Sequence, residues 1–133
     1  MIGAGSFRPI REGMDTGTAR ELDRSEWGSY FDDLDRRMEH GLDLDASIEI
    51  AGGDVDGTEA AHMPLDAITY EDGDDQIAIG LGGRGARYPA ALWHFVDEPA
   101  RVWVHEERGV PEAIGVESSD GTYTFIRLRP ATP

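Results

Sequence analysis

The architecture is set by residues 23–50, DRSEWGSYFDDLDRRMEHGLDLDASIEI, where the spacing of apolar residues changes at Gly41. Before Gly41 the apolar residues form one stripe at helical spacing: Trp27, Tyr30, Phe31, Leu34 and Met38. After Gly41 they alternate with polar residues along residues 42–50, which is the pattern of a strand with one wet face. The segment therefore predicts an amphipathic helix followed by a half-buried strand.

Both ends of the helix carry recognisable signals. Asp23 and Glu26 have the spacing of a capping box, in which each side chain accepts a hydrogen bond from the other's backbone. Arg36 and Arg37 lie in the last turn, where positive charge suits the helix dipole, and Gly41 provides a stop. The helix is predicted to follow Asp23 directly, with Asp32, Asp33 and Asp35 pointing away from the apolar stripe.

The remainder reads as short strands joined by tight connections. A hairpin is expected with Glu71 opposite Gln76, and another turning at Asp120-Gly121, a strong hairpin signal. A weaker strand is expected over residues 58–63, and residues 89–96 and 101–107 are expected to pair as a hairpin. The predicted fold is α+β: an N-terminal amphipathic helix packed on a curled antiparallel, barrel-like sheet of about seven or eight short strands.

The chain of 133 residues is long enough for one domain and short for two. We expect residues 1–19 to be a mobile tail, residues 20–129 to form a single compact domain, and residues 130–133 to be a C-terminal tail. There is no signal-peptide pattern and no apolar run of about 20 residues, so we expect a cytoplasmic protein with no membrane contact.

Charge is unevenly distributed. The chain has a net charge of −15, and residues 12–75 alone hold 20 acidic residues against four arginines. This acidic half has three interpretations: a solvated surface, adaptation to salt, or a face that docks a basic partner or mimics nucleic acid. Direct binding to nucleic acid is not expected, because polyanions repel each other.

The sequence lacks the residue types or motifs that several catalytic and metal-binding functions require. The chain has no cysteine and no lysine, which excludes disulfides, thiolate metal sites and lysine Schiff bases. No serine lies in a nucleophile elbow, and the glycine-rich residues 80–85 do not match a phosphate-binding loop. Asp54 and Asp56 begin a calcium-loop pattern but lack its remaining ligands. We therefore predict no catalytic residues, no metal site and no cofactor.

One face of the predicted 89–107 hairpin carries the candidate binding residues. If Val96 pairs with Arg101, then Trp93 and Phe95 face Val102 and Val104. The opposite face then presents the predicted binding residues Leu92, His94, Arg101, Trp103 and His105. This face is either an exposed aromatic surface or, if the helix covers it, part of the core.

The chain also resembles a family of small bacterial and archaeal proteins classed as a domain of unknown function. The resemblance rests on the order of several short motifs over about residues 20–129: RELDRSEW (20–27), YFD (30–32), MPL (63–65), ITY (68–70), PARVWV (99–104) and DGT (120–122). It implies a self-contained domain and supplies no activity, ligand or catalytic residue.

These observations favour a non-catalytic acidic accessory or regulatory domain that acts through protein–protein contact. The expected partner is a basic protein or a second copy of the chain, as in a homodimer. Two alternatives remain open. One is a small-molecule-binding barrel or small enzyme that uses His94, His105 and Arg101, and the other is a nucleic-acid mimic.

Overall fold

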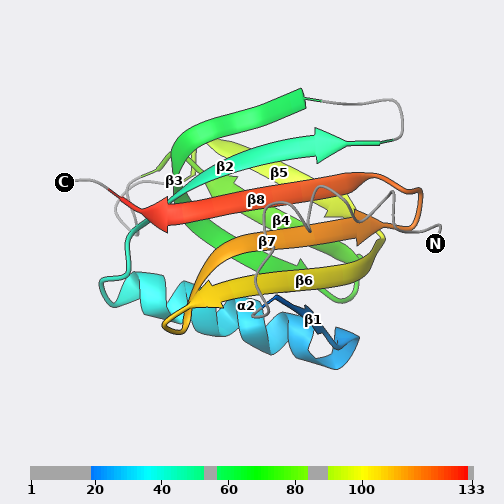
Figure 1. Cartoon of the computed structure of the whole chain (residues 1–133), viewed down its shortest axis with the longest axis horizontal. Helices are drawn as coiled ribbons and strands as arrows, with labels where there is room; N and C mark the ends of the chain where they lie inside the picture. The colour runs from blue at the N-terminus through cyan, green and yellow to red at the C-terminus, as the bar shows by residue number, and fades with distance from the viewer. Residues whose placement is uncertain (1–18, 53–56, 84–89, 132–133) are drawn as a thin grey trace.

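The computed structural model describes residues 19–52, 57–83 and 90–131. One helix packs on an eight-stranded antiparallel sheet that is curled but not closed, which confirms the predicted α+β class (Figure 1). The elements are β1 (Arg20–Leu22), α2 (Arg24–Glu39), β2 (Leu44–Ala51), β3 (Gly57–Glu71), β4 (Gln76–Leu81), β5 (Leu92–Asp97), β6 (Pro99–Glu107), β7 (Val110–Ser118) and β8 (Tyr123–Pro130).

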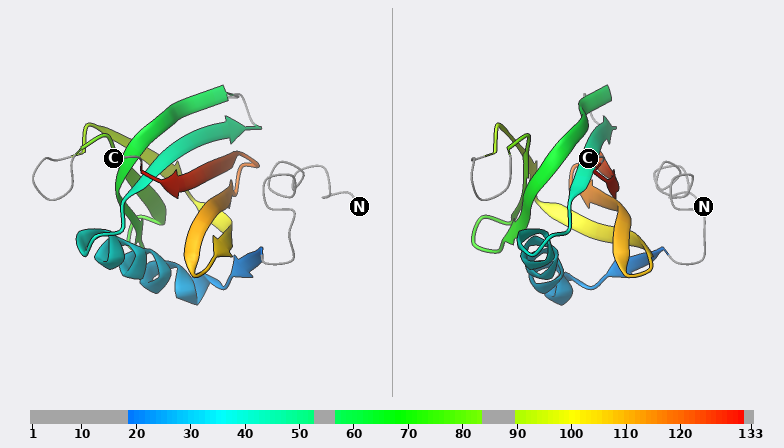
Figure 2. Two further views of the ribbon diagram at one scale, coloured as in Figure 1. Left: turned by 60° about the vertical axis from the view of Figure 1, so that its left-hand side comes forward. Right: turned by 90° about the vertical axis from the view of Figure 1, so that its left-hand side faces the viewer.

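The strand order is β1-β6-β7-β8-β2-β3-β4-β5, so β1 and β5 are the two edges. Figure 2 shows the strands wrapping around an interior, with the helix lying across one end. Trp27, Phe31 and Leu34 are the buried residues of α2, as the apolar stripe predicts. The core continues through the inward residues of both halves of the sheet, including Ile48, Ile68, Ile79, Val104, Ile114 and Ile126.

The local signals for the helix are confirmed. Asp23 is the N-cap and forms the capping box with Glu26, and its carboxylate accepts a hydrogen bond from the Ser25 amide. His40 is the C-cap, and Gly41 follows it with a φ of 114°, a conformation that favours glycine. Asp35 differs from expectation, because its carboxylate turns toward the sheet and accepts a hydrogen bond from the Ile68 amide at 2.9 Å.

The predicted register of one hairpin and the predicted turn of another are also confirmed. Glu71 lies opposite Gln76 and Tyr70 opposite Ile77, and β7 and β8 pair around the turn that contains Asp120. In each case a short turn joins neighbouring segments, and in the first hairpin the alternation of apolar residues is enough to set the register.

The weaker strand expected over residues 58–63 belongs to one long strand, β3. Its residues 57–64 pair with β2 and its residues 65–71 pair with β4. The chain bends between the two halves through register shifts, and His62 adopts a φ of 52°. These irregularities let a single strand pass from one half of the curled sheet to the other.

The expected hairpin between residues 89–96 and 101–107 is wrong. In the described part of the chain β5 pairs with β4, whereas β6 pairs with β7 and β1. Glu98, with a φ of 51°, and Pro99 turn the chain at a corner, so β6 continues into a different part of the sheet. The short edge strand β1, within a segment to which we assigned no strand, pairs Leu22 with Val102.

Candidate functional site

The predicted binding residues are not brought onto one face. Leu92 and His94 share the inward side of β5 with Val96, and Leu92 packs against the main core. Arg101, Trp103 and His105 alternate along β6 with the buried residues Val102 and Val104, so they belong to the outer side of that strand. The corner at Glu98 and Pro99 separates the two groups.

Trp93 and Phe95 on β5 are exposed, whereas the predicted hairpin placed them against Val102 and Val104. Trp93 is 46% exposed and Phe95 is 51% exposed, and these are the exposed large apolar side chains of the described residues. Their rings stack at a centroid distance of 6.3 Å with an interplanar angle of 15°. The prediction that they face Val102 and Val104 is therefore wrong, because those valines are fully buried in the core.

Small residues on β4 let the two rings lie close to the sheet. Gly80 lies opposite Trp93 and Ala78 lies opposite Phe95. A Cβ on Gly80 would be 2.9 Å from the indole Cη2 of Trp93, so a larger residue would force the ring to move. The two rings therefore pack over the small residues Gly80 and Ala78 of the neighbouring strand β4.

The β5 strand is also an edge strand of the sheet that the described residues form. It follows β4 at the end of the strand order, and residues 90–96 contain no acidic or basic residue other than His94. Natural proteins commonly protect sheet edges with charge, proline or short strand length, because unpaired backbone groups invite another strand. We call Trp93, Phe95 and the outer edge of β5 the β5 edge surface.

Trp103 lies in a second, separate cluster on the outer side of β6, β7 and β8. This cluster contains Ala113, Tyr123 and Phe125, with Ala19, Ala51 and Trp103 packed against it. The Trp103 and Tyr123 ring centroids are 6.2 Å apart, and the Arg127 guanidinium lies 5.1 Å from the Phe125 ring centroid. Trp103 is half-buried in this cluster and does not project from the surface as Trp93 does.

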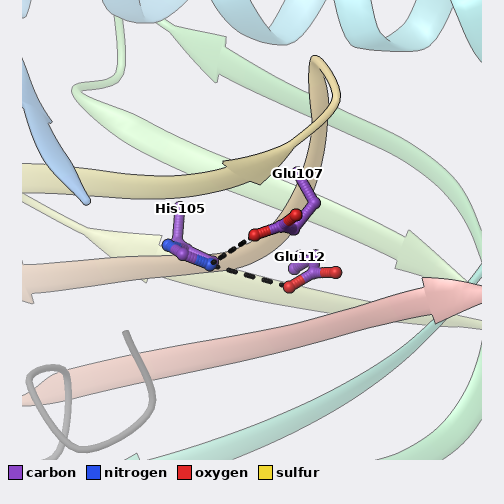
Figure 3. Close-up of side chains that lie close together, drawn as sticks. All are labelled: His105, Glu107 and Glu112. Carbon is purple, nitrogen blue, oxygen red and sulfur yellow. Dashed lines mark ion pairs between the residues drawn. The ribbon is translucent and has the colours of Figure 1, made fainter. Parts of the chain in front are cut away.

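His105 is at the end of the same outer side, where it meets two carboxylates (Figure 3). Its Nε2 is 3.6 Å from Glu112 Oε1 and 4.0 Å from Glu107 Oε2. One ligand atom from each of the three residues lies within 4.8 Å of the others. These are the described residues that could hold a metal ion.

Arg24 fixes the corner that separates the two surfaces. Its Nη2 donates a hydrogen bond to the Pro99 carbonyl at 2.9 Å, and its Nη1 donates to the Tyr70 hydroxyl at 3.1 Å. The guanidinium also lies 4.4 Å from the Trp27 ring centroid and 3.3 Å from Asp75 Oδ1. One side chain at the start of α2 therefore joins the helix, the β3–β4 turn and the start of β6.

Two further polar groups join α2 to the sheet. The Tyr30 hydroxyl donates a hydrogen bond to Glu106 at 2.5 Å, and burial together with this bond raises the tyrosine pKa. Burial raises the pKa of Asp35 to about 6, although the hydrogen bond from Ile68 acts in the opposite direction. Both groups fix the helix on the sheet.

Sequence reasoning missed the exposed aromatic pair and the three-residue cluster for different reasons. Residues 92–96, LWHFV, are apolar at both odd and even positions, so alternation does not reveal their inward side. The only local signal was Glu98-Pro99, which is typical of a break. A bulge in β7 brings Glu112 close to His105, and no sequence motif predicts this bulge.

Fold and surfaces together define a small α+β domain with one capped helix on an open, curled antiparallel sheet. Residues 18–132 match the family described as "Family of unknown function (DUF5335)", and the chain belongs to that family. This confirms the resemblance seen in the sequence motifs, and the family brings no assigned activity.

A similar protein occurs in Aquifex aeolicus (strain VF5), where it is described as an uncharacterized protein. It is 24% identical over 115 residues, which cover 86% of this chain and 95% of the Aquifex protein. No solved structure matches the chain. Within its described part, no helix is long and apolar enough to cross a membrane.

Proposed function

We propose that this chain is a non-catalytic accessory or regulatory domain that binds protein through the β5 edge surface, and that the bound protein is a second copy of the chain. The observation that carries the proposal is the stacked pair Trp93 and Phe95, about half exposed on an edge strand. Exposed aromatic residues on an edge strand are suited to adding a further strand.

The spacing of the aromatic pair suits a symmetric dimer. In an antiparallel pairing of two β5 strands centred on His94, Trp93 of one copy lies opposite Phe95 of the other. The two-fold axis repeats the contact, so two aromatic cross-strand pairs form on the same side of the joined sheet. In the same register Asp97 lies opposite Ala91, so the carboxylate at the end of the strand does not meet its own copy.

Charge favours this edge over other places for two copies to meet. The whole chain carries −15, so most approaches bring carboxylates together. Along residues 90–96 that repulsion is absent locally. Salt screens the remaining long-range repulsion, so self-association should strengthen as ionic strength rises, whereas binding of a basic partner would weaken.

Sedimentation equilibrium of the purified chain at low and moderate salt tests the proposal, over about a hundredfold range of concentration because edge interfaces are small. We expect a monomer–dimer equilibrium in the wild type. Phe95→Glu should weaken dimerisation by about tenfold or more, because it places a carboxylate opposite the Trp93 ring. Ser29→Glu adds the same charge on the exposed helix surface and should leave the equilibrium much less changed.

Circular dichroism of each variant checks that the fold is retained. A wild type that stays monomeric throughout overturns the proposal, as does a folded Phe95→Glu variant that dimerises as well as the wild type. A dimer that dissociates when salt is added also contradicts it, because such a dimer would be held by attraction between opposite charges.

A further inference from the structure

The side chains of His105, Glu107 and Glu112 converge at the turn that joins β6 to β7 (Figure 3). We propose that these three residues form a site for one divalent transition-metal ion of the zinc class. The His105 imidazole and one oxygen from each carboxylate would be the protein ligands, and the remaining positions would be open to water or to a donor atom from another molecule.

The backbone of β6 and β7 directs the three side chains to the same side of the sheet. His105 and Glu107 are two residues apart on β6, so their side chains leave the strand on the same side. On β7, His105 pairs with Ala113 and Glu106 pairs with Pro111, which leaves Glu112 as the extra residue of a β-bulge. A regular strand would direct Glu112 away from the side of Ala113, and the bulge turns it back toward His105.

The turn itself holds this arrangement firmly. Glu107 pairs with Val110, so only Arg108 and Gly109 form the connection, and both have positive φ, at 54° and 80°. This is the conformation of the tight two-residue hairpin that matches strand twist. Arg37 of α2 donates a hydrogen bond to the Gly109 carbonyl at 2.9 Å, which fixes the turn to the helix.

The distances suit a small metal ion. Zinc binds imidazole nitrogen and carboxylate oxygen at about 2.0–2.2 Å, so two ligands on one ion lie no more than about 4.4 Å apart. The separations from His105 Nε2, 3.6 Å and 4.0 Å, are both within this limit. The two carboxylates are about half exposed, so their side chains can rotate to close on an ion.

Competing cations among the described residues around the cluster would be arginine side chains. Among the described residues, no arginine lies within ion-pair distance of Glu107 or Glu112, and the ion pairs of both involve His105. The His105 side chain is only 6% exposed, with its Nε2 on the side of the two carboxylates. A buried imidazole beside two carboxylates is a donor set for zinc and related ions, whereas calcium and magnesium prefer oxygen alone.

Isothermal titration of the full chain with Zn²⁺, and visible absorption spectra with Co²⁺, test the site. The chain should bind one ion saturably, and Glu107→Gln and Glu112→Gln should each weaken binding by about tenfold or more. Both substitutions keep side-chain size at half-exposed positions, so the fold should be retained. Glu49→Gln, an exposed strand carboxylate outside the cluster, is the control for nonspecific attraction to an acidic protein.

Binding that is lost in both cluster variants and kept in Glu49→Gln supports the site. The proposal is overturned if Zn²⁺ binds without saturation, or if the cluster variants and the control bind it equally well. Co²⁺ should produce ligand-field absorption in the wild type, and its absence would also contradict imidazole coordination. None of these results depends on whether the chain dimerises.

Discussion

Asp35 is a partly buried carboxylate on the side of the helix that faces β3. It accepts a hydrogen bond from the Ile68 amide, yet burial and the nearby Asp32 and Glu39 raise its pKa from 3.8 to about 6. The folded chain therefore holds this proton more tightly than the unfolded chain. The contribution of Asp35 to stability is greatest below about pH 4 and is lost as the pH rises toward about 6.

Replacing Asp35 by Asn should remove this dependence and keep an acceptor for the Ile68 amide. Relative to the wild type, Asp35→Asn should gain about 1 kcal/mol in free energy of unfolding between pH 4 and pH 7, after allowance for partial exposure. Urea unfolding at both pH values measures the difference. Asp33→Asn, exposed on the same helix, is the control for loss of a surface charge. If Asp35→Asn instead loses stability relative to the wild type as the pH rises, the raised pKa of Asp35 is contradicted.

At the scale of elements, α2 is joined to the corner between β5 and β6 by Arg24. This guanidinium bonds the Pro99 carbonyl and the Tyr70 hydroxyl while lying over the Trp27 ring. The corner is the point at which the chain leaves one half of the sheet for the other. It also separates the β5 edge surface from the Trp103 cluster.

Arg24→Met should keep the aliphatic contact with Trp27 and lose the hydrogen bonds. We expect a loss of about 1–2 kcal/mol in free energy of unfolding, measured by chemical denaturation. Arg36→Met is the matched control, because Arg36 is similarly exposed but makes only a surface ion pair with Asp33, and its loss should cost about 0.5 kcal/mol or less.

Hydrogen exchange distinguishes a local effect from a general one. The Glu98 amide bonds the Asp75 carbonyl and the Ser119 amide bonds the Glu98 carbonyl, both at the corner. Protection of these two amides should fall most in Arg24→Met. Equal loss of stability in the two arginine variants would show that Arg24 does not fix the corner.

The elements also show which parts of the fold can be predicted from the sequence. The capped helix and the hairpin that joins Glu71 to Gln76 were predictable, because their signals and partners lie close together in the chain. The course of β3 and the partners of β5 and β6 depend on strands far away in sequence, and local alternation does not specify them. The same limit applies to the candidate site. The sequence drew attention to Trp103 and His105 on β6. It did not predict that Trp93 and Phe95 are exposed, because their exposure depends on the corner between β5 and β6.

At the scale of the whole molecule, the two sheet edges differ. The β1 edge has three residues, which is too short to accept a long added strand, whereas β5 has six residues and no acidic or basic residue before Asp97 other than His94. The chain has a net charge of −15, yet the β5 edge of its described sheet carries two exposed aromatic residues and no acidic residue before Asp97. The proposed self-association through β5 rests on this contrast between the two edges.

The most direct test of the proposed self-association is the distance between the two β5 strands in the proposed dimer. The chain has no cysteine, so Asp97→Cys offers a single attachment point for a spin label. In the register centred on His94 the two labelled positions are six residues apart along the paired strands, or about 20 Å, and the labels extend this to about 20–30 Å. A dimer paired through β5 in this register should give a dipolar distance in that range by pulsed electron paramagnetic resonance. A distance above about 40 Å, or no dipolar coupling at concentrations that favour association, would contradict it.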